Sequence, residues 1–162
     1  MKIFKILVFA LLTITAACSD EKSSDTAVKN SGKSLVIYKQ NTNDVRKGYF
    51  VEVADTREAM AKGLMGRNSL DKDAGFLFDV NLIPSDMEIA MWMKDTLIPL
   101  DMLFMDSEGK IYYIHENAVP YSTNAIMAPS RPRAVLEING GQVKEYGIEI
   151  GDIVKAELFG NM

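Results

Sequence analysis

Short apolar runs separated by polar turns fill most of the chain after residue 34. The runs are rich in β-branched and aromatic residues, a composition typical of strands. They predict strands at residues 34–39, 48–53, 75–80, 102–106, 110–116, 135–139 and 153–158. Ser107-Glu108-Gly109 has the composition of a tight turn. We therefore expect the fourth and fifth runs to form a hairpin in which Gly109 takes a positive φ angle.

Residues 87–93 alternate most cleanly, which predicts an eighth strand because the two faces of a strand repeat every second residue. The residues of one face would be Met87, Ile89, Met91 and Met93, and those of the other Glu88, Ala90, Trp92 and Lys94. The methionine and isoleucine face is the one expected to pack on a core.

One helix is expected between the second and third strands. Asp55 is a suitable N-cap, Glu58 follows three residues later, and Lys62 and Gly63 would end the helix after two turns. Seven or eight short strands with one or two short helices predict a mostly-β (α+β) fold, a compact barrel or sandwich. This single domain would span residues 35–162.

The first 18 residues predict an export signal that ends in a lipid attachment site. Lys2 and Lys5 precede an apolar run, Ile6 to Leu12, that is too short to cross a bilayer. The box Thr15-Ala16-Ala17-Cys18 resembles the bacterial lipobox, in which the cysteine becomes the first mature residue and carries a diacylglyceryl group. Residues 1–17 would then be a lipoprotein signal peptide. Cleavage without lipidation and retention as a signal anchor are the alternatives.

The lone cysteine favours lipidation at Cys18, because a structural cysteine in an exported protein normally has a disulfide partner. Ser19 follows it, which resembles the signal that sends Gram-negative lipoproteins to the outer membrane. Residues 18–34 are almost without apolar side chains and predict a flexible tether. Such a tether holds the domain about 20–25 Å from the bilayer on average. The expected location is the periplasmic face of the outer membrane.

Charge and composition narrow the expected partners. Removal of residues 1–17 leaves 16 lysines and arginines against 22 aspartates and glutamates, a net charge of −6. An acidic chain without a basic cluster is a poor candidate for nucleic-acid binding. With 48% hydrophobic residues the chain can bury a proper core in one domain. The chain contains neither a phosphate-binding loop nor a G-x-G-x-x-G motif, so we expect no cofactor.

Four segments identify a family resemblance. They are GLMGR (63–67), MWMKDT (91–96), IPLD (98–101) and VLEINGG (135–141). In this order they resemble DUF192, a bacterial and archaeal domain family of unknown function, over about residues 51–154. The family usually reads Phe-Trp-Met-Lys-Asn-Thr in the second segment, where this chain has Met91 and Asp95. The resemblance implies a compact, mostly-β, often exported domain and no established activity.

Polar residues within these segments are the candidate site. They are Arg67, Trp92, Lys94, Asp95, Thr96, Asp101 and Glu137. Arg67 or Lys94 could hold a carboxylate or phosphate, Asp101 or Glu137 could act as a base, and Trp92 could stack on a flat ligand. Alternatively, the same residues form ion pairs and turn caps, as Asp95-Thr96 between two strands would do.

The methionines raise a separate possibility. Eight of the ten lie between Met60 and Met127, and soft thioethers suit Cu(I). Methionine also fills irregular cores, which explains the same pattern without copper. His115 is the only histidine and cannot build a metal site by itself. We therefore expect no metal site.

The sequence favours a membrane-tethered binding or accessory module over an enzyme. Its ligand would be a small molecule, a glycan or an envelope protein, bound where residues 63–67 approach residues 92–101. A hydrolase or transferase that uses Asp101 or Glu137 with Arg67 is the alternative. A Cu(I)-binding module is the third hypothesis.

Overall fold

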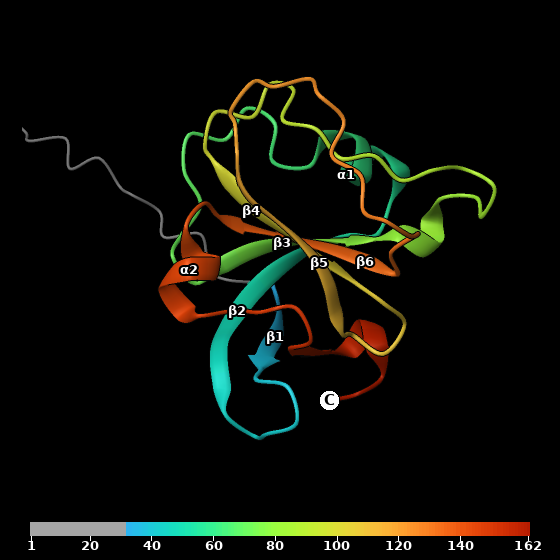
Figure 1. Ribbon diagram of the computed structural model, residues 1–162. Helices are drawn as coiled ribbons and strands as arrows, with labels where there is room; N and C mark the ends of the chain where they lie inside the picture. Colours follow the sequence, from blue (N-terminus) through green and yellow to red (C-terminus); the bar gives the residue numbers. More distant parts are fainter. Residues whose placement is uncertain (1–31) are drawn as a thin grey trace, which may run out of the picture.

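The computed structural model describes residues 32–162, and the signal sequence, Cys18 and most of the predicted tether lie outside these residues. Seven strands, two short α-helices and two 3-10 turns form one curled sheet with its covering loops (Figure 1). The strands are β1 (Lys33–Tyr38), β2 (Val45–Ala54), β3 (Ala74–Asp79), β4 (Leu100–Met105), β5 (Ile111–Ala118), β6 (Ala134–Asn139) and β7 (Ile153–Ala156). The helices are α1 (Arg57–Lys62) and α2 (Gln142–Tyr146), and the 3-10 turns are η1 (Val80–Leu82) and η2 (Glu157–Phe159).

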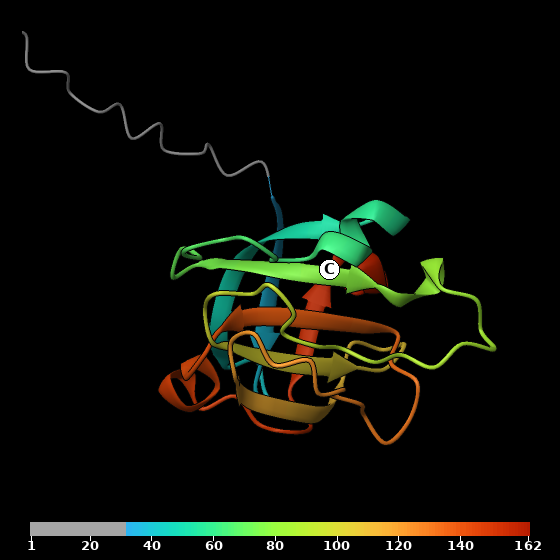
Figure 2. The same cartoon turned by 90° about the horizontal axis from the view of Figure 1, so that it is seen from above.

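The strand order is β5-β4-β6-β3-β2-β1-β7, and only the β2–β3 pair is parallel. The sheet curls into a half-barrel, and Figure 2 shows β1 (blue) turned strongly away from the direction of β3, β6 and β4. The two ends of the curl meet at a bridge between Lys110 and Ile153. The predicted mostly-β fold is confirmed, with seven strands rather than eight.

The alternation of side chains gives the sheet two apolar faces. Inside the curl lies a core that includes Leu35, Ile37, Leu103 and Leu136. The opposite face carries a second core, to which Phe104 belongs, and α1 and the long loops 80–99 and 119–133 cover this face. Both faces are therefore shielded from water, and a polar side chain on either face is buried unless it lies at an edge.

The hairpin of β4 and β5 is confirmed. Asp106 and Lys110 are joined by a backbone hydrogen bond of 3.0 Å across the turn, and Gly109 has a φ of +82°. A Cβ atom at Gly109 would lie 2.3 Å from the carbonyl oxygen of Val154. The glycine thus serves both the turn and the close approach of β7.

The helix α1 begins one residue later than predicted. Thr56, not Asp55, is the N-cap: its backbone is extended and its side-chain oxygen accepts from the backbone N–H of Ala59 at 3.1 Å. Gly63 ends the helix as expected. The shorter α2 follows Gly140-Gly141 and is the second of the one or two short helices expected. Within residues 32–162 no helix is long and apolar enough to cross a membrane.

The strand predicted at 87–93 is not part of the sheet. This segment makes a single bridge, between Met91 and Ile126 of the loop that follows β5. Ile89 and Met93 are buried as predicted, whereas Met87 is 56% exposed. Alternation of apolar and polar residues indicates which side chains face the core. A strand also needs a neighbouring strand to pair with along its length, and loop 119–133 provides only one bridge.

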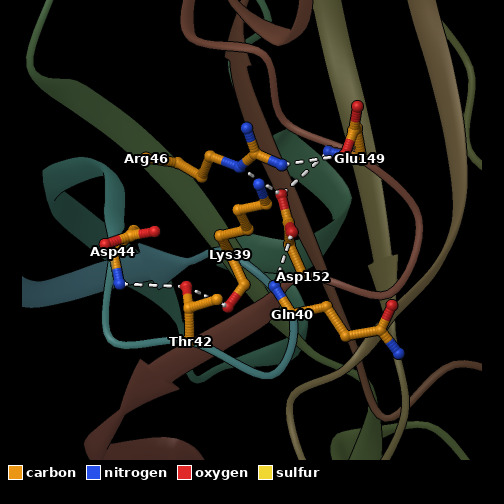
Figure 3. A network of polar contacts seen from close by, with 7 residues as sticks. All are labelled: Lys39, Gln40, Thr42, Asp44, Arg46, Glu149 and Asp152. Atoms are coloured by element: carbon orange, nitrogen blue, oxygen red, sulfur yellow. Dashed lines mark hydrogen bonds and ion pairs between the residues drawn. The ribbon is translucent and has the colours of Figure 1, made fainter.

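A buried carboxylate ties the turn after β1 to the start of β7 (Figure 3). Asp152 accepts hydrogen bonds from the backbone N–H groups of Gln40 at 3.0 Å and Glu149 at 2.9 Å. It also pairs with Arg46 Nε at 3.0 Å. Each partner comes from a different stretch of chain, so Asp152 adds side-chain contacts at the end of the sheet where β1 pairs with β2 and β7.

Candidate functional site

One buried carboxyl lies in the middle of the sheet, on the face that the loops cover. Glu137 of β6 is paired with Phe76 of β3 on one side and with Met102 of β4 on the other. Only 4% of its surface is exposed. Glu137 lies on the face of β6 opposite Leu136 and Ile138, which belong to the core inside the curl. The second face is also covered, however, so the side chain is buried.

A pocket opens above Glu137, with a cavity volume of about 170 Å³. Its wall comes from α1 and the turn after it, from the end of β3, and from the loop that leads to β4. The apolar lining includes Met60, Leu64, Met65, Phe78, Val80, Ile83, Met87, Ile89, Met91 and Trp92, and the polar side chains are Lys62, Glu88, Thr96 and Glu137. Glu137 is thus the deeply buried charge-bearing group of this pocket.

Burial raises the pKa of Glu137 to about 8. Desolvation is the sole cause, since no hydrogen bond or charged neighbour among the described residues contributes. Every fully enclosed side-chain nitrogen or oxygen in this part of the chain has a partner. The carboxyl oxygens of Glu137 must therefore touch the pocket space, where a ligand could reach them.

Arg67 lies near this pocket but is already engaged. Its guanidinium donates two hydrogen bonds of 2.6 Å to the carboxylate of Glu52, and it lies 5.9 Å from the centre of the Phe76 ring. These hydrogen bonds hold the pKa of Glu52 below its ordinary value, and Lys62 lowers it further. Arg67 and Lys62 are thus directed toward Glu52, and Phe76 separates Glu52 from Glu137 in the sheet.

Trp92 and Lys94 point outward, on the side opposite Met93. Trp92 is 50% exposed and lines the pocket mouth, whereas Lys94 is exposed and does not line the pocket. An exposed tryptophan at the entrance of an apolar cavity suits contact with a ligand or partner.

Asp101 lies on the other face of the sheet from Glu137 and is fully buried. Its two oxygens accept from the backbone N–H groups of Asn117 and Val143, both at 2.8 Å. These hydrogen bonds fasten the end of β5 and the start of α2 to β4. The structure therefore brings Glu137 and Trp92 to one pocket and does not bring Asp101 there.

Asp95 and Thr96 lie at the turn between Trp92, at the pocket, and the start of β4. Asp95 has a φ of +52°, and its carbonyl accepts from the N–H of Gly66 at 2.8 Å. Thr96 is buried and donates its hydroxyl hydrogen to the carbonyl of Lys94 at 3.2 Å. After glycine, asparagine and aspartate are the residues that best tolerate a positive φ, so Asp95 suits this turn.

The methionine wall was not assigned to a site by the sequence. Met60 and Met65 flank the end of α1, and Met87 and Met91 lie on the facing loop. Their clustering is a property of the tertiary fold, because the two segments are more than twenty residues apart. Residues 32–162 hold no cluster of three histidine, cysteine, aspartate or glutamate side chains that could bind a metal.

Comparison with known proteins places the chain in a family. No curated protein matches it. It is similar to a solved structure from Sinorhizobium meliloti 1021 that is named as a proposed transcription regulator. The two chains share 36% identity with a TM-score of 0.71, and the match covers 78% of this chain and 94% of that chain. A Novosphingobium aromaticivorans DSM 12444 protein of unknown function is similar at 34% identity and a TM-score of 0.68, covering 75% of this chain and 83% of that one.

The family match covers residues 38–156, nearly all of the described domain. It contains the four segments on which the resemblance rested, and the structure brings three of them together around the pocket: residues 63–67, 91–96 and 135–141. The chain belongs to the DUF192 family, described as "Uncharacterized ACR".

Proposed function

We propose that this chain is a lipid-anchored binding or accessory module of the bacterial envelope, whose ligand enters the pocket above Glu137. The observation that carries the proposal is a buried carboxyl that no other described residue pairs with and that reaches the pocket space. Burying a carboxyl group without a hydrogen bond costs on the order of 1–3 kcal/mol in proteins. A group that destabilises the fold and faces a cavity is explained most simply by a ligand.

Catalysis is the second candidate, because a carboxyl with a pKa of about 8 could serve as a general acid or base. Two observations favour binding instead. Arg67 is neutralised by Glu52, and the hydroxyl of Thr96, the only one in the pocket lining, is committed to the carbonyl of Lys94. The buried end of the pocket therefore offers an acid or base without a hydroxyl nucleophile or a cation beside it, since Lys62 lies at the exposed rim.

The anchoring part of the proposal is supported by the sequence alone. Cys18 follows a small-residue pair at the end of an apolar run, and the polar segment after it would act as the tether. Several acyl chains at one cysteine make anchoring stable where a single chain is marginal. Cys18→Ser should abolish palmitate labelling and release the protein from the membrane fraction, whereas retention in that fraction would contradict a lipid anchor.

The proposal does not include transcription regulation, the role in the name of the Sinorhizobium relative. Residues 32–162 hold 14 lysines and arginines against 19 aspartates and glutamates. A net charge of −5 repels the phosphate backbone, whose attraction dominates nucleic-acid affinity.

A pocket-blocking variant tests the binding function. Ala90 lines the pocket and is exposed, so Ala90→Trp should fill the cavity without disturbing either core. We expect envelope metabolites or glycan fragments that raise the Tm of the full chain to have no effect on Ala90→Trp. Glu116→Gln, a change at an exposed site on β5, is the matched control and should keep the response. A broad screen without any shift, or shifts that persist in Ala90→Trp, would contradict the proposal.

A further inference from the structure

The charges around the pocket differ between its rim and its buried end. Lys62 and Glu88 are exposed residues of the lining, whereas Glu137 is deeply buried. Its neighbours in the sheet, Phe76 and Met102, carry no charge. The buried end of the pocket therefore offers a single ionisable group, and it is an acid.

The charged groups on the surrounding elements do not compensate this acid. From the α1 side, Arg67 and Lys62 act on Glu52. From the covering loops, Glu88 adds a second acid at the rim, and the guanidinium of Arg131 donates to the backbone carbonyls of Ile83 and Met87. Arg131 does not contribute to the pKa of Glu137. His115 of β5 lies one strand beyond Met102 and makes no contribution to Glu137. An anionic ligand would find no positive group at the buried end, whereas a cation would meet an unpaired carboxylate.

The apolar wall is also suited to a cation. Thioether sulfur is polarisable, and four methionines line the pocket. The ring of Trp92 at the mouth presents the best π face for a positively charged group. Such a lining can contact the hydrocarbon part of a ligand and also accommodate its positive charge, provided that this charge is paired at the buried end of the pocket.

We propose that this pocket binds a small organic cation, with its charged nitrogen against the Glu137 carboxylate and its hydrocarbon part between the methionines and Trp92. The proposal rests on the binding function above and names the chemical class of the ligand. Glu137 is mostly protonated at neutral pH in the empty pocket, so binding must release one proton. The carboxylic acid and the ammonium ion give a carboxylate–ammonium pair and one free proton.

Three four-carbon probes of similar size test the proposal: n-butylammonium, n-butanol and n-butyrate. They carry a positive, a neutral and a negative head group on an unbranched chain, and an alkylammonium, like lysine with a pKa of about 10.4, stays charged through the range used. Affinity for the full chain is measured by NMR titration between pH 6 and pH 9. We expect the order butylammonium, then butanol, then butyrate.

The pH dependence is the sharper readout. With a Glu137 pKa of about 8 in the empty pocket, the affinity for butylammonium should rise about ninefold from pH 6 to pH 7 and level off near pH 9. Butanol should show no such rise. Glu137→Gln should remove both the pH dependence and the preference for the cation. Glu116→Gln, which changes an exposed acid of β5 outside the pocket, should preserve both.

The outcomes separate this proposal from the one on which it rests. Equal binding of butanol and butylammonium at all pH values in the wild-type chain would overturn the cation and leave the binding pocket intact. Absence of binding by all three probes would overturn both. Silver(I) binding that is lost in Met60→Leu or Met91→Leu, without butylammonium binding, would overturn the organic cation in favour of a soft metal. The wild-type comparison needs no variant and stands even if Glu137→Gln fails to fold.

Discussion

Asp101 and Asp152 resemble Glu137 in burial and differ from it in every contact. Asp152 accepts two backbone N–H groups and pairs with Arg46, and Asp101 accepts two backbone N–H groups. Glu137 is paired with no other described residue and touches a cavity. Two of the three carboxyl groups thus hold the fold together, and the third destabilises it at a place where a ligand can reach.

Position along the strand explains the difference. The partners of Asp101 and Asp152 are N–H groups at a turn, at the start of a helix or where strand pairing is irregular, which the ladder leaves free. Glu137 lies in the middle of β6 between two paired strands, where the backbone groups nearby are used by the ladder. A carboxyl in mid-sheet can be satisfied only by side chains, and its neighbours there are Phe76 and Met102. The fold cannot satisfy this group, so an external partner is the natural explanation.

Substitution of Asp152 should have the largest effect on the free energy of unfolding. Asp152→Ala leaves Arg46 and two backbone N–H groups without their acceptor, so we expect a loss of about 3–5 kcal/mol in the free energy of unfolding. Urea denaturation of the full chain measures it. Glu149 is the exposed partner of the same arginine, and Glu149→Gln should cost less than about 1 kcal/mol. Similar losses for the two variants would show that the burial of Asp152 is not what matters.

Asp101→Asn should come next in size. The amide can still accept at one oxygen, but its NH₂ group would face a backbone donor, Asn117 or Val143. We expect a loss of about 2–4 kcal/mol in the free energy of unfolding, without a change in probe binding at the pocket. If this variant is stable and loses ligand binding instead, Asp101 belongs to the functional site and the division between the two kinds of carboxyl fails.

Glu137→Gln should stabilise the protein, whereas the two aspartate substitutions destabilise it. Between pH 4.5 and about 8 the unfolded chain releases the Glu137 proton and the folded chain keeps it, so this group makes the protein less stable as the pH rises. The drop should amount to about 2–4 kcal/mol by pH 8. Glu137→Gln should lack it and be more stable than the wild type at pH 8, as measured by urea denaturation at pH 5 and pH 8. A parallel pH dependence of the two chains would contradict an unpaired, buried carboxyl.

The sequence predicted much of the fold because local patterns decide it. Short apolar runs rich in β-branched and aromatic residues predict all seven strands, and Gly109 predicts the hairpin turn. Residues 87–93 alternate as a strand does, but their partner is a bent loop, and no property of the segment itself reveals that. The helix α1 begins at Thr56 because its side chain, not that of Asp55, meets the free N–H groups.

The site was predictable only in part. Glu137 and Trp92 were singled out by their place in the four characteristic segments, and the structure brings both to one pocket. Asp101 and Arg67 belong to the same segments. A sequence pattern does not show that Asp101 already accepts two backbone N–H groups, or that Arg67 already pairs with Glu52. The methionine wall depends on two loops folding toward each other, so no local signal could identify it.

The protonation of Glu137 tests the central claim most directly. The side-chain carboxyl carbon can be followed by ¹³C NMR of the full chain from pH 4 to pH 10, and assigned by its absence in Glu137→Gln. An unpaired carboxyl in the pocket should titrate with a pKa of about 8, and saturation with butylammonium should bring that pKa down. A pKa near 4.5 in the empty protein would mean that Glu137 is solvated or paired, and the contrast with Asp101 and Asp152 would not hold.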